Sequence, residues 1–361
     1  MHTVKVSLDE QSYPIHIGNG LLNQLGLRSA QLKLGQRCAV ITDETVAKKY
    51  LRPAVDSLRS AGFQVAAIKL KAGEKTKTLK NVHICYDQLA AHRLERNSFV
   101  VALGGGVMGD LAGFTAATYL RGIPLIQVPT TLLAQVDSSV GGKVGVNLPA
   151  GKNLVGAFHQ PRLVLCDLDT LRTLPQREFR AGLAEVIKYG VIYDAKFFSR
   201  LERDLPMLLK RTDSTLAATI TRCCRIKAEV VAQDEKESDL RTILNFGHTI
   251  GHALEAISRY GKYRHGEAIS IGQVAAAIIS HELIGLSTKD TTSIATIFER
   301  AGLPVNVKLS TAQTRQLISA MRLDKKVSAG EIKFVLAKRI GKVITGQTVS
   351  TKIIRQALNR K

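Results

Sequence analysis

The sequence predicts an α/β protein with a parallel sheet in its first half and a mainly α-helical second half. Three observations support this prediction. Short apolar strands alternate with helical stretches up to about residue 105, a glycine-rich turn then joins a strand to a helix, and long helical periodicities dominate after about residue 179. Strands that alternate with helices indicate a parallel sheet with crossover helices.

The elements of the first half follow from hydrophobic periodicity. Residues 2–8 and 13–17 alternate between apolar and polar side chains, as in a hairpin. Apolar runs typical of strands cover residues 38–42, 64–70 and 99–103. The periodic stretches between them predict helices at residues 44–61 and 78–92.

The second half has few strand-like runs. Its helical periodicities cover residues 214–233, 249–260, 268–283 and 291–301. This change from alternating strands and helices to helical periodicity predicts two domains, residues 1–178 and 179–361.

Composition narrows the function classes. A chain of 361 residues with 45% hydrophobic content is long enough for two domains with sizeable cores. The formal net charge of +21 suits an acidic partner, but the basic residues are dispersed and only 5% of residues are aromatic. We therefore expect no nucleic-acid partner, although the charge alone leaves that class open.

Targeting and redox signals are absent from the sequence. We find no apolar run near the roughly 20 residues of a membrane span, and the N-terminus lacks a leader pattern, so we expect no membrane association and a cytoplasmic location. The five cysteines are scattered without Cys-x-x-Cys spacing, which indicates reduced core residues rather than disulfides or zinc ligands.

A glycine-rich turn follows the strand at residues 99–103. Gly104, Gly106 and Gly109 satisfy the dinucleotide-binding fingerprint, in which backbone N–H groups approach a pyrophosphate at a helix N-terminus. The helix is expected from Leu111. No acidic residue follows at the usual distance, so Asp43, after an earlier strand, is the candidate ribose partner. The alternative is a tight strand-to-helix turn without a ligand.

A second polar segment covers residues 134–153. It places Asp137, Lys143, Asn147, Lys152 and Asn153 among glycines and small residues, a composition suited to the capture of a phosphate or carboxylate. A solvated loop is the alternative.

A carboxylate and two imidazoles, Glu185, His248 and His265, are able to form a three-ligand divalent metal site with an open position for a substrate. His248 and His252 are four residues apart on a predicted helix and share one face. This spacing fits two metal ligands, one ligand and one acid–base group, or a pair that is only packed.

These strings occur together in an order typical of one family. The sequence resembles the 3-dehydroquinate synthase family over essentially its whole length, through GEKTK, GGGVMGD, YLRGIPLIQVPTTLLAQVDSSVGGKVGVN, GKNLVGAFHQP, AEVIKYG, RIKAEVVAQDE, LNFGHTIGHALE and HGEAISIG. The resemblance implies a Rossmann-like α/β NAD domain followed by a C-terminal, mainly α-helical metal-binding domain. It also implies a homodimer.

The resemblance also implies roles for individual residues. It assigns zinc, or cobalt in its place, to Glu185, His248 and His265, and it moves His252 to proton transfer and phosphate binding. The positions implied for NAD are Asp43, Glu74, Lys77, Gly105, Gly106, Val107, Gly109, Asp110, Thr130, Thr131, Lys143, Lys152, Thr170, Leu171, Arg172 and Thr173. Those implied for the substrate are Arg121, Asp137, Lys143, Lys152, Asn153, Lys188, Lys227, Arg241, Asn245, His252 and Lys338.

The implied reaction converts 3-deoxy-D-arabino-heptulosonate 7-phosphate to 3-dehydroquinate and phosphate. Transient oxidation by NAD acidifies a C–H bond, phosphate leaves by β-elimination, the hydride returns, and ring opening with aldol closure gives the carbocycle. The anionic sugar phosphate explains the many basic residues among the implied positions. A sister sugar phosphate cyclase, such as 2-deoxy-scyllo-inosose or 2-epi-5-epi-valiolone synthase, and a metal-dependent polyol dehydrogenase are the alternatives.

Overall fold

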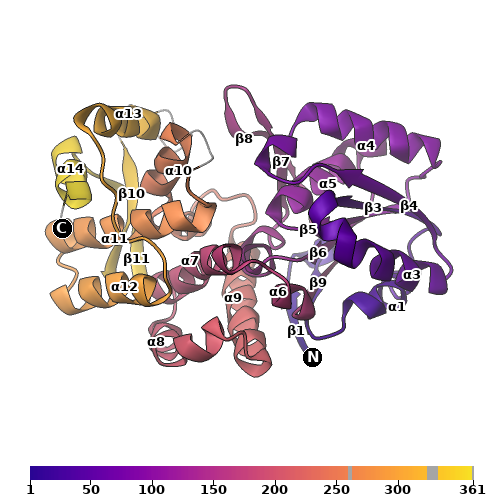
Figure 1. Cartoon of the computed structure of the whole chain (residues 1–361), viewed down its shortest axis with the longest axis horizontal. Coiled ribbons are helices and arrows are strands. Elements are labelled where there is room, and N and C mark those ends of the chain that lie inside the picture. Colours follow the sequence, from indigo (N-terminus) through magenta and orange to yellow (C-terminus); the bar gives the residue numbers. More distant parts are fainter. Residues whose placement is uncertain (259–261, 323–331, 360–361) are drawn as a thin grey trace. The chain divides into compact units, whose positions relative to one another are not determined.

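The computed structural model describes residues 1–258, 262–322 and 332–359, and the chain folds into two compact units (Figure 1). Unit 1 comprises Met1–Leu174 and Leu216–Lys236, and unit 2 comprises Pro175–Thr215 and Glu237–Lys361. The sequence analysis placed a single boundary after residue 178. Residues 216–236 nevertheless pack with the first unit, where the Cys224 thiol donates to the Gln135 carbonyl over 3.3 Å.

Unit 1 is built on a seven-stranded sheet. The strand order is β1-β2-β9-β6-β5-β3-β4, and all neighbours are parallel except the β1–β2 hairpin. This confirms the predicted hairpin and parallel sheet. The strands are β1 (His2–Val6), β2 (Tyr13–Gly18), β3 (Arg37–Asp43), β4 (Gln64–Leu70), β5 (Phe99–Gly104), β6 (Leu125–Pro129) and β9 (Leu163–Asp167).

Helices cover both faces of this sheet. Because successive strand residues point to opposite sides, each strand contributes side chains to two cores. In β3, Cys38 and Val40 belong to the core that includes residues of α1 and α3, whereas Ala39 and Ile41 belong to the core that includes residues of α4 and α5. These helices are α1 (Leu25–Ala30), α3 (Arg52–Ser60), α4 (Leu79–Ala91) and α5 (Gly106–Thr118).

The predicted helix at residues 44–61 is helical but interrupted. It begins as α2 (Glu44–Val46), passes through a π-helical turn η3 (Ala47–Leu51) and continues as α3. Pro53 lies in the first turn of α3. Proline lacks the N–H that an uninterrupted α-helix requires, which accounts for the altered hydrogen bonding before it.

The polar segment at residues 134–153 is not a simple loop. It contains η6 (Ala134–Ser138) and then an antiparallel hairpin of β7 (Lys143–Leu148) and β8 (Gly151–Phe158). The remaining elements of unit 1 are η1 (Asp9–Gln11), η2 (Leu22–Gln24), η4 (Glu74–Thr76), η5 (Tyr119–Arg121), α6 (Asp169–Arg172) and most of α9 (Asp213–Gln233).

Unit 2 is mainly helical, as predicted. Its helices are α7 (Gln176–Ile192), α8 (Ala195–Leu209), η7 (Leu240–Asn245), α10 (His248–Ile257), α11 (His265–Ile284), α12 (Thr288–Arg300), α13 (Thr311–Arg322) and α14 (Thr351–Asn359). One hairpin, β10 (Lys333–Arg339) with β11 (Lys342–Thr348), completes it. The predicted helix at residues 249–260 ends at Ile257 in the structure, and position 260 lies outside the described residues.

Helix α11 is the central helix of unit 2. Two of its glycines allow close backbone contacts: a Cβ atom on Gly266 would lie 1.8 Å from the Ala181 carbonyl oxygen, and one on Gly272 would lie 2.0 Å from that of Gly247. Among the described residues, α11 also has the length and composition to cross a membrane, which the search for apolar runs did not anticipate. Because 67% of its apolar window is buried, it resembles a core helix.

Candidate metal and dinucleotide sites

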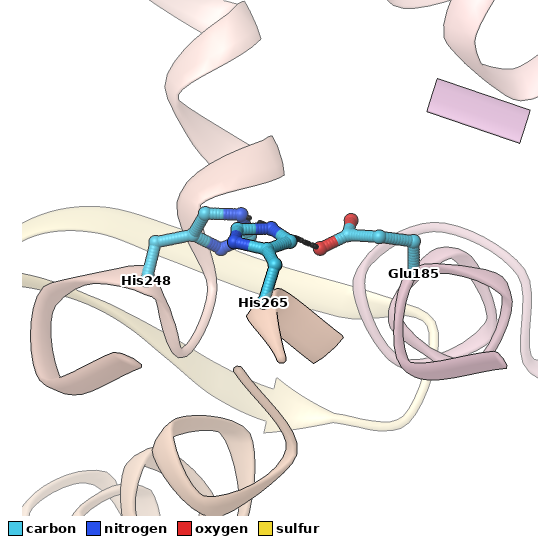
Figure 2. Close-up of side chains that lie close together, drawn as sticks. All are labelled: Glu185, His248 and His265. Atoms are coloured by element: carbon cyan, nitrogen blue, oxygen red, sulfur yellow. Dashed lines mark ion pairs between the residues drawn. The ribbon is translucent and has the colours of Figure 1, made fainter. Parts of the chain in front are cut away.

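The three predicted metal ligands of unit 2 lie together. Glu185 points from the middle of α7 toward the rings of His248 and His265, which are the first residues of α10 and α11 (Figure 2). Glu185 Oε1 lies 3.5 Å from His248 Nε2 and 3.6 Å from His265 Nε2. All three ligand atoms lie within 4.8 Å of one another, a spacing that one metal ion can bridge.

The other ring nitrogen of each histidine has its own partner. His248 Nδ1 lies 3.2 Å from the Phe246 carbonyl oxygen, and His265 Nδ1 lies 3.2 Å from Glu255 Oε2. A proton on Nδ1 leaves the lone pair on Nε2, the nitrogen that faces Glu185. When the imidazoles are neutral, these contacts favour the tautomer that presents Nε2 to a metal.

Glu255 was not assigned by the sequence analysis. It is buried on α10 and follows His252 by three residues. The local string HALE gives a weak signal for it, because a carboxylate near candidate histidine ligands is a frequent hydrogen-bond partner. Only the fold shows that its partner is His265.

The buried charges of the site are paired with one another. Glu185 is fully buried and forms an ion pair with Lys188, which is also buried. Burial lowers the pKa of His265, but hydrogen bonds to Glu185 and Glu255 outweigh it and raise the pKa to about 10. A metal requires the neutral imidazole, so metal binding at this site releases a proton. The donor set of two imidazoles and one carboxylate fits zinc.

His252 lies beside the metal ligands. Its ring centroid is 5.2 Å from that of His248 and 6.0 Å from that of His265. His252, Glu255 and His265 form a second group of suitable atoms. In that group the Nδ1 atom of His265 is already bonded to Glu255, whereas the Glu185 group uses the Nε2 atoms that face one another.

In unit 1, the glycine turn forms the start of a helix. Gly105 is the N-cap of α5, which begins at Gly106 rather than at the expected Leu111. A Cβ atom on Gly105 would lie 3.1 Å from Thr131 Cγ2, and one on Gly106 would lie 3.0 Å from Ser138 Oγ. Glycine lets the turn pack closely against these two side chains, and it leaves the backbone N–H groups at the helix N-terminus, a position suited to a dinucleotide phosphate.

The other residues predicted for NAD differ in what they expose. Asp43 caps α2 by accepting from the N–H groups of Thr45 and Val46 over 2.8 and 3.0 Å. Leu171 is fully buried, and Val107 is partly buried against the core.

The threonines predicted for NAD are held by local bonds. The Thr130 N–H donates to the Gly104 carbonyl over 2.9 Å, and Thr131 Oγ1 accepts from the Ala134 N–H. Thr170 Oγ1 accepts from Gln135 over 3.2 Å, and Thr173 Oγ1 lies 2.6 Å from the Tyr50 hydroxyl. Arg172 is paired with Asp169 on α6 at 3.0 Å.

Asp110 and Lys77 form an ion pair near the glycine turn. Burial raises the pKa of Asp110, and the adjacent Lys77 ammonium lowers it. Lys77 Nζ also donates to Asn153 Oδ1 over 2.5 Å. These bonds join a residue predicted for the substrate to two predicted for NAD.

The remaining residues predicted for the substrate in unit 1 lie in different settings. Lys227 Nζ, on α9, contacts Asp137 Oδ1 and the Asp137 carbonyl oxygen, both at 2.5 Å. Lys152 Nζ lies 3.9 Å from Glu74 Oε1. Arg121 and Lys143 are exposed, and Arg121 adopts a positive φ of 68° at the end of η5.

In unit 2, Lys188 is next to the metal ligands and Arg241 is buried in η7. Asn245 Nδ2 donates to Glu237 Oε1 over 2.9 Å. Lys338 is exposed on β10.

Known proteins are similar to this chain in sequence and in fold. The family models for the N-terminal and C-terminal parts of 3-dehydroquinate synthase match residues 67–181 and 182–327. The chain is 51% identical to a 3-dehydroquinate synthase of Nostoc punctiforme over 357 residues, which is 98% of each protein.

Two solved structures have nearly the same fold. One is 2-epi-5-epi-valiolone synthase from Streptomyces hygroscopicus with NAD⁺ and Zn²⁺ bound, with a TM-score of 0.89, 27% identity and coverage of 98% of this chain and 97% of that one. The other is 2-deoxy-scyllo-inosose synthase with carbaglucose-6-phosphate, NAD⁺ and Co²⁺, with a TM-score of 0.89, 27% identity and 99% coverage of both.

The chain has an α/β unit with a glycine turn at a helix N-terminus and a helical unit with two imidazoles and a carboxylate, and its fold is that of the two solved sugar phosphate cyclases. Sequence identity distinguishes the members of this class from one another. The identity of this chain to the Nostoc punctiforme 3-dehydroquinate synthase is 51% over 98% of each protein. The chain belongs to the 3-dehydroquinate synthase family.

Proposed function

We propose that the protein is a 3-dehydroquinate synthase, which converts 3-deoxy-D-arabino-heptulosonate 7-phosphate to 3-dehydroquinate and phosphate with NAD and a divalent metal as cofactors. The observation that carries this proposal is the metal ligand set of Glu185, His248 and His265, found in a chain that belongs to this family. Zinc is the metal that suits these donors best.

Each cofactor is assigned to the unit whose residues fit it. Glu185, His248 and His265 of unit 2 would hold the metal, and the turn from Gly105 to Asp110 of unit 1 would hold the NAD pyrophosphate. When bound, NAD takes up and returns a hydride and zinc polarises substrate hydroxyls. Lys188 fixes the carboxylate of Glu185, and Glu255 fixes the ring of His265.

The basic residues match an anionic substrate. A heptulosonate phosphate carries a carboxylate and a phosphate, which ammonium and guanidinium groups bind by charge-assisted hydrogen bonds. We assign this role to Arg121, Lys143, Lys152, Lys188, Lys227, Arg241 and Lys338, with Asp137, Asn153, Asn245 and His252 as polar partners. Arg241 and Lys227 are buried, so their charges are preorganised rather than solvated.

The finer assignments extend to the cofactor contacts and the assembly. We assign NAD contacts to Asp43, Glu74, Lys77, Thr130, Thr131 and the segment 170–173. A homodimer, which the family resemblance implies, and a cytoplasmic location are part of the proposal. Light scattering of the purified protein tests the dimer, because a monomeric mass would refute it.

The first experiment measures phosphate release from the heptulosonate phosphate by metal-replete protein, with and without catalytic NAD. We expect phosphate and dehydroquinate in equal amounts, with no net NADH. Turnover of a different sugar phosphate, with none of the heptulosonate, would instead identify a sister cyclase. Net NADH formation from a polyol would identify a dehydrogenase.

Two variants on the same helix show whether the activity needs the metal ligands. Glu185→Gln should remove metal and turnover together. Glu178→Gln, two turns earlier on α7 and paired with Arg264 at 2.9 Å, is the matched control and should keep both. Turnover and full metal content in Glu185→Gln would refute the assignment.

A further inference from the structure

Asn147 connects two segments of unit 1 through its side-chain amide. It lies near the end of β7, where its Nδ2 donates to Glu74 Oε1 over 2.7 Å and its Oδ1 accepts from the Asn153 N–H over 3.0 Å. Its backbone N–H also donates to the Lys77 carbonyl over 2.9 Å. One residue therefore holds η4 and the β7–β8 hairpin together.

The two segments carry residues that the proposed function assigns to different ligands. Glu74 and Lys77 are assigned to NAD, whereas Asn153 is assigned to the substrate. Lys77 Nζ completes the connection, because it donates to Asn153 Oδ1 over 2.5 Å and pairs with Asp110. The hydrogen bonds thus run from Glu74 through Asn147 and Asn153 to Lys77 and Asp110.

The backbone of Asn153 is left-handed at the point where Asn147 holds it. Its φ is +54°, a conformation that asparagine adopts more readily than most residues other than glycine, and its N–H donates to Asn147 Oδ1. Asn153 is exposed and Lys152 is half-buried, and both lie at the start of β8, next to the turn of the hairpin. An amide suits the position between a carboxylate and an N–H, because it donates with its nitrogen and accepts with its oxygen.

We infer that Asn147 is a positioning residue that couples NAD binding to substrate binding. NAD contacts order Glu74 and Lys77, and Asn147 transmits that order to Asn153 and Lys152. The inference rests on the proposed function, since it uses the ligand assignments made there. Asn147 itself is not assigned to either ligand.

The primary test compares Asn147→Ala with the wild type as metal-replete enzyme. A hydrogen bond to a charged group is worth about tenfold in an equilibrium constant. We expect the Kd of NAD and the KM of the heptulosonate phosphate each to rise about tenfold, with kcat falling less than threefold. A residue that only supported the fold would lower the amount of active enzyme and leave both constants unchanged.

A second variant separates the two hydrogen bonds. Asn147→Asp keeps the acceptor for the Asn153 N–H but places a carboxylate against Glu74, so it should weaken NAD binding about tenfold. Because Asn153 then loses its connection to Glu74, the substrate KM should also rise, but by less than in Asn147→Ala. In a Glu74→Gln background the bond reforms with donor and acceptor exchanged. There, Asn147→Asp should change the Kd of NAD by less than twofold.

The matched control is Asn81→Ala. Asn81 Nδ2 donates to the Thr76 carbonyl over 2.7 Å, so its side chain also anchors η4, through a hydrogen bond within one segment of the chain. In Asn81→Ala, the Kd of NAD and the KM of the heptulosonate phosphate should stay within twofold of the wild type. Equal losses in Asn81→Ala and Asn147→Ala would overturn the inference, as would additive effects of Asn147→Asp and Glu74→Gln.

The outcomes separate this inference from the proposed function. Wild-type protein that does not turn over the heptulosonate phosphate would refute the proposed function, and the inference with it. Wild-type turnover, with both constants of Asn147→Ala within twofold of the wild type, would overturn the inference alone.

Discussion

Replacing Glu255 tests whether hydrogen bonding around the metal ligands sets the metal affinity. The carboxylate is buried and its Oε2 accepts from His265 Nδ1 over 3.2 Å, which leaves Nε2 as the ligand atom. A hydrogen bond to a charged group contributes about 1.5–3 kcal/mol. Since about 1.4 kcal/mol corresponds to tenfold, losing this bond should weaken metal binding about 10- to 100-fold.

The conservative and the truncating variant should fall at different ends of this range. Glu255→Gln retains an acceptor without the charge, so we expect a loss near tenfold. Glu255→Ala removes the acceptor, so we expect a loss near 100-fold.

The assay is competition for Zn²⁺ between the protein and a chromophoric chelator at fixed pH. Thermal unfolding of each variant verifies that it is folded. Glu299→Gln, an exposed change on α12, should bind Zn²⁺ as the wild type does. Zinc affinities of both Glu255 variants within twofold of the wild type would refute the reasoning.

Three further predictions follow from the same structure. Lys227→Met should lower kcat/KM more than 100-fold, because it removes the cation that pairs with the Asp137 carboxylate. Adding Asp137→Asn to Lys227→Met should recover thermal stability but not activity. Recovery of both would contradict the assignment. Gly266→Ala should destabilise the protein by about 3 kcal/mol or more in urea unfolding, because its Cβ would collide with the Ala181 carbonyl; an unchanged midpoint would disprove this contact. In metal-free protein the pKa of His265 is raised from 6.5 to about 10, so the folded state binds more protons than the unfolded state, and the stability contribution present below pH 6.5 should be lost as the pH rises to about 10. His265→Asn should lack this decrease in urea unfolding across the same pH range, and an identical pH dependence would count against the pKa shift.

Much of the fold of unit 1 could be predicted because its strands are short apolar runs bounded by clear breaks. The predicted strand at residues 64–70 coincides with β4, and that at 99–103 falls within β5. The hairpin of β7 and β8 was not predicted, since its glycines and lysines have low strand propensity. Cross-strand pairing overrides that propensity, for example between Val146 and Val155.

The boundary between the units shows what local patterns cannot reveal. Helix α9 has ordinary helical periodicity, and nothing in its sequence tells which unit it joins. Its membership of unit 1 depends on contacts with residues about 90 positions earlier, such as those between Lys227 and Asp137. Such long-range contacts become visible only when the chain is folded.

The sequence by itself determined the class of the sheet, the helical character of unit 2, the family, and the three residue types of the metal site, because these depend on periodicity and on local strings. Tertiary structure decided which nitrogen of His265 faces Glu185, and it determined the hydrogen-bond partners of Glu255 and Asn147. The physical reason is that hydrogen-bond direction depends on where side chains distant in sequence meet, and local periodicity carries no record of that.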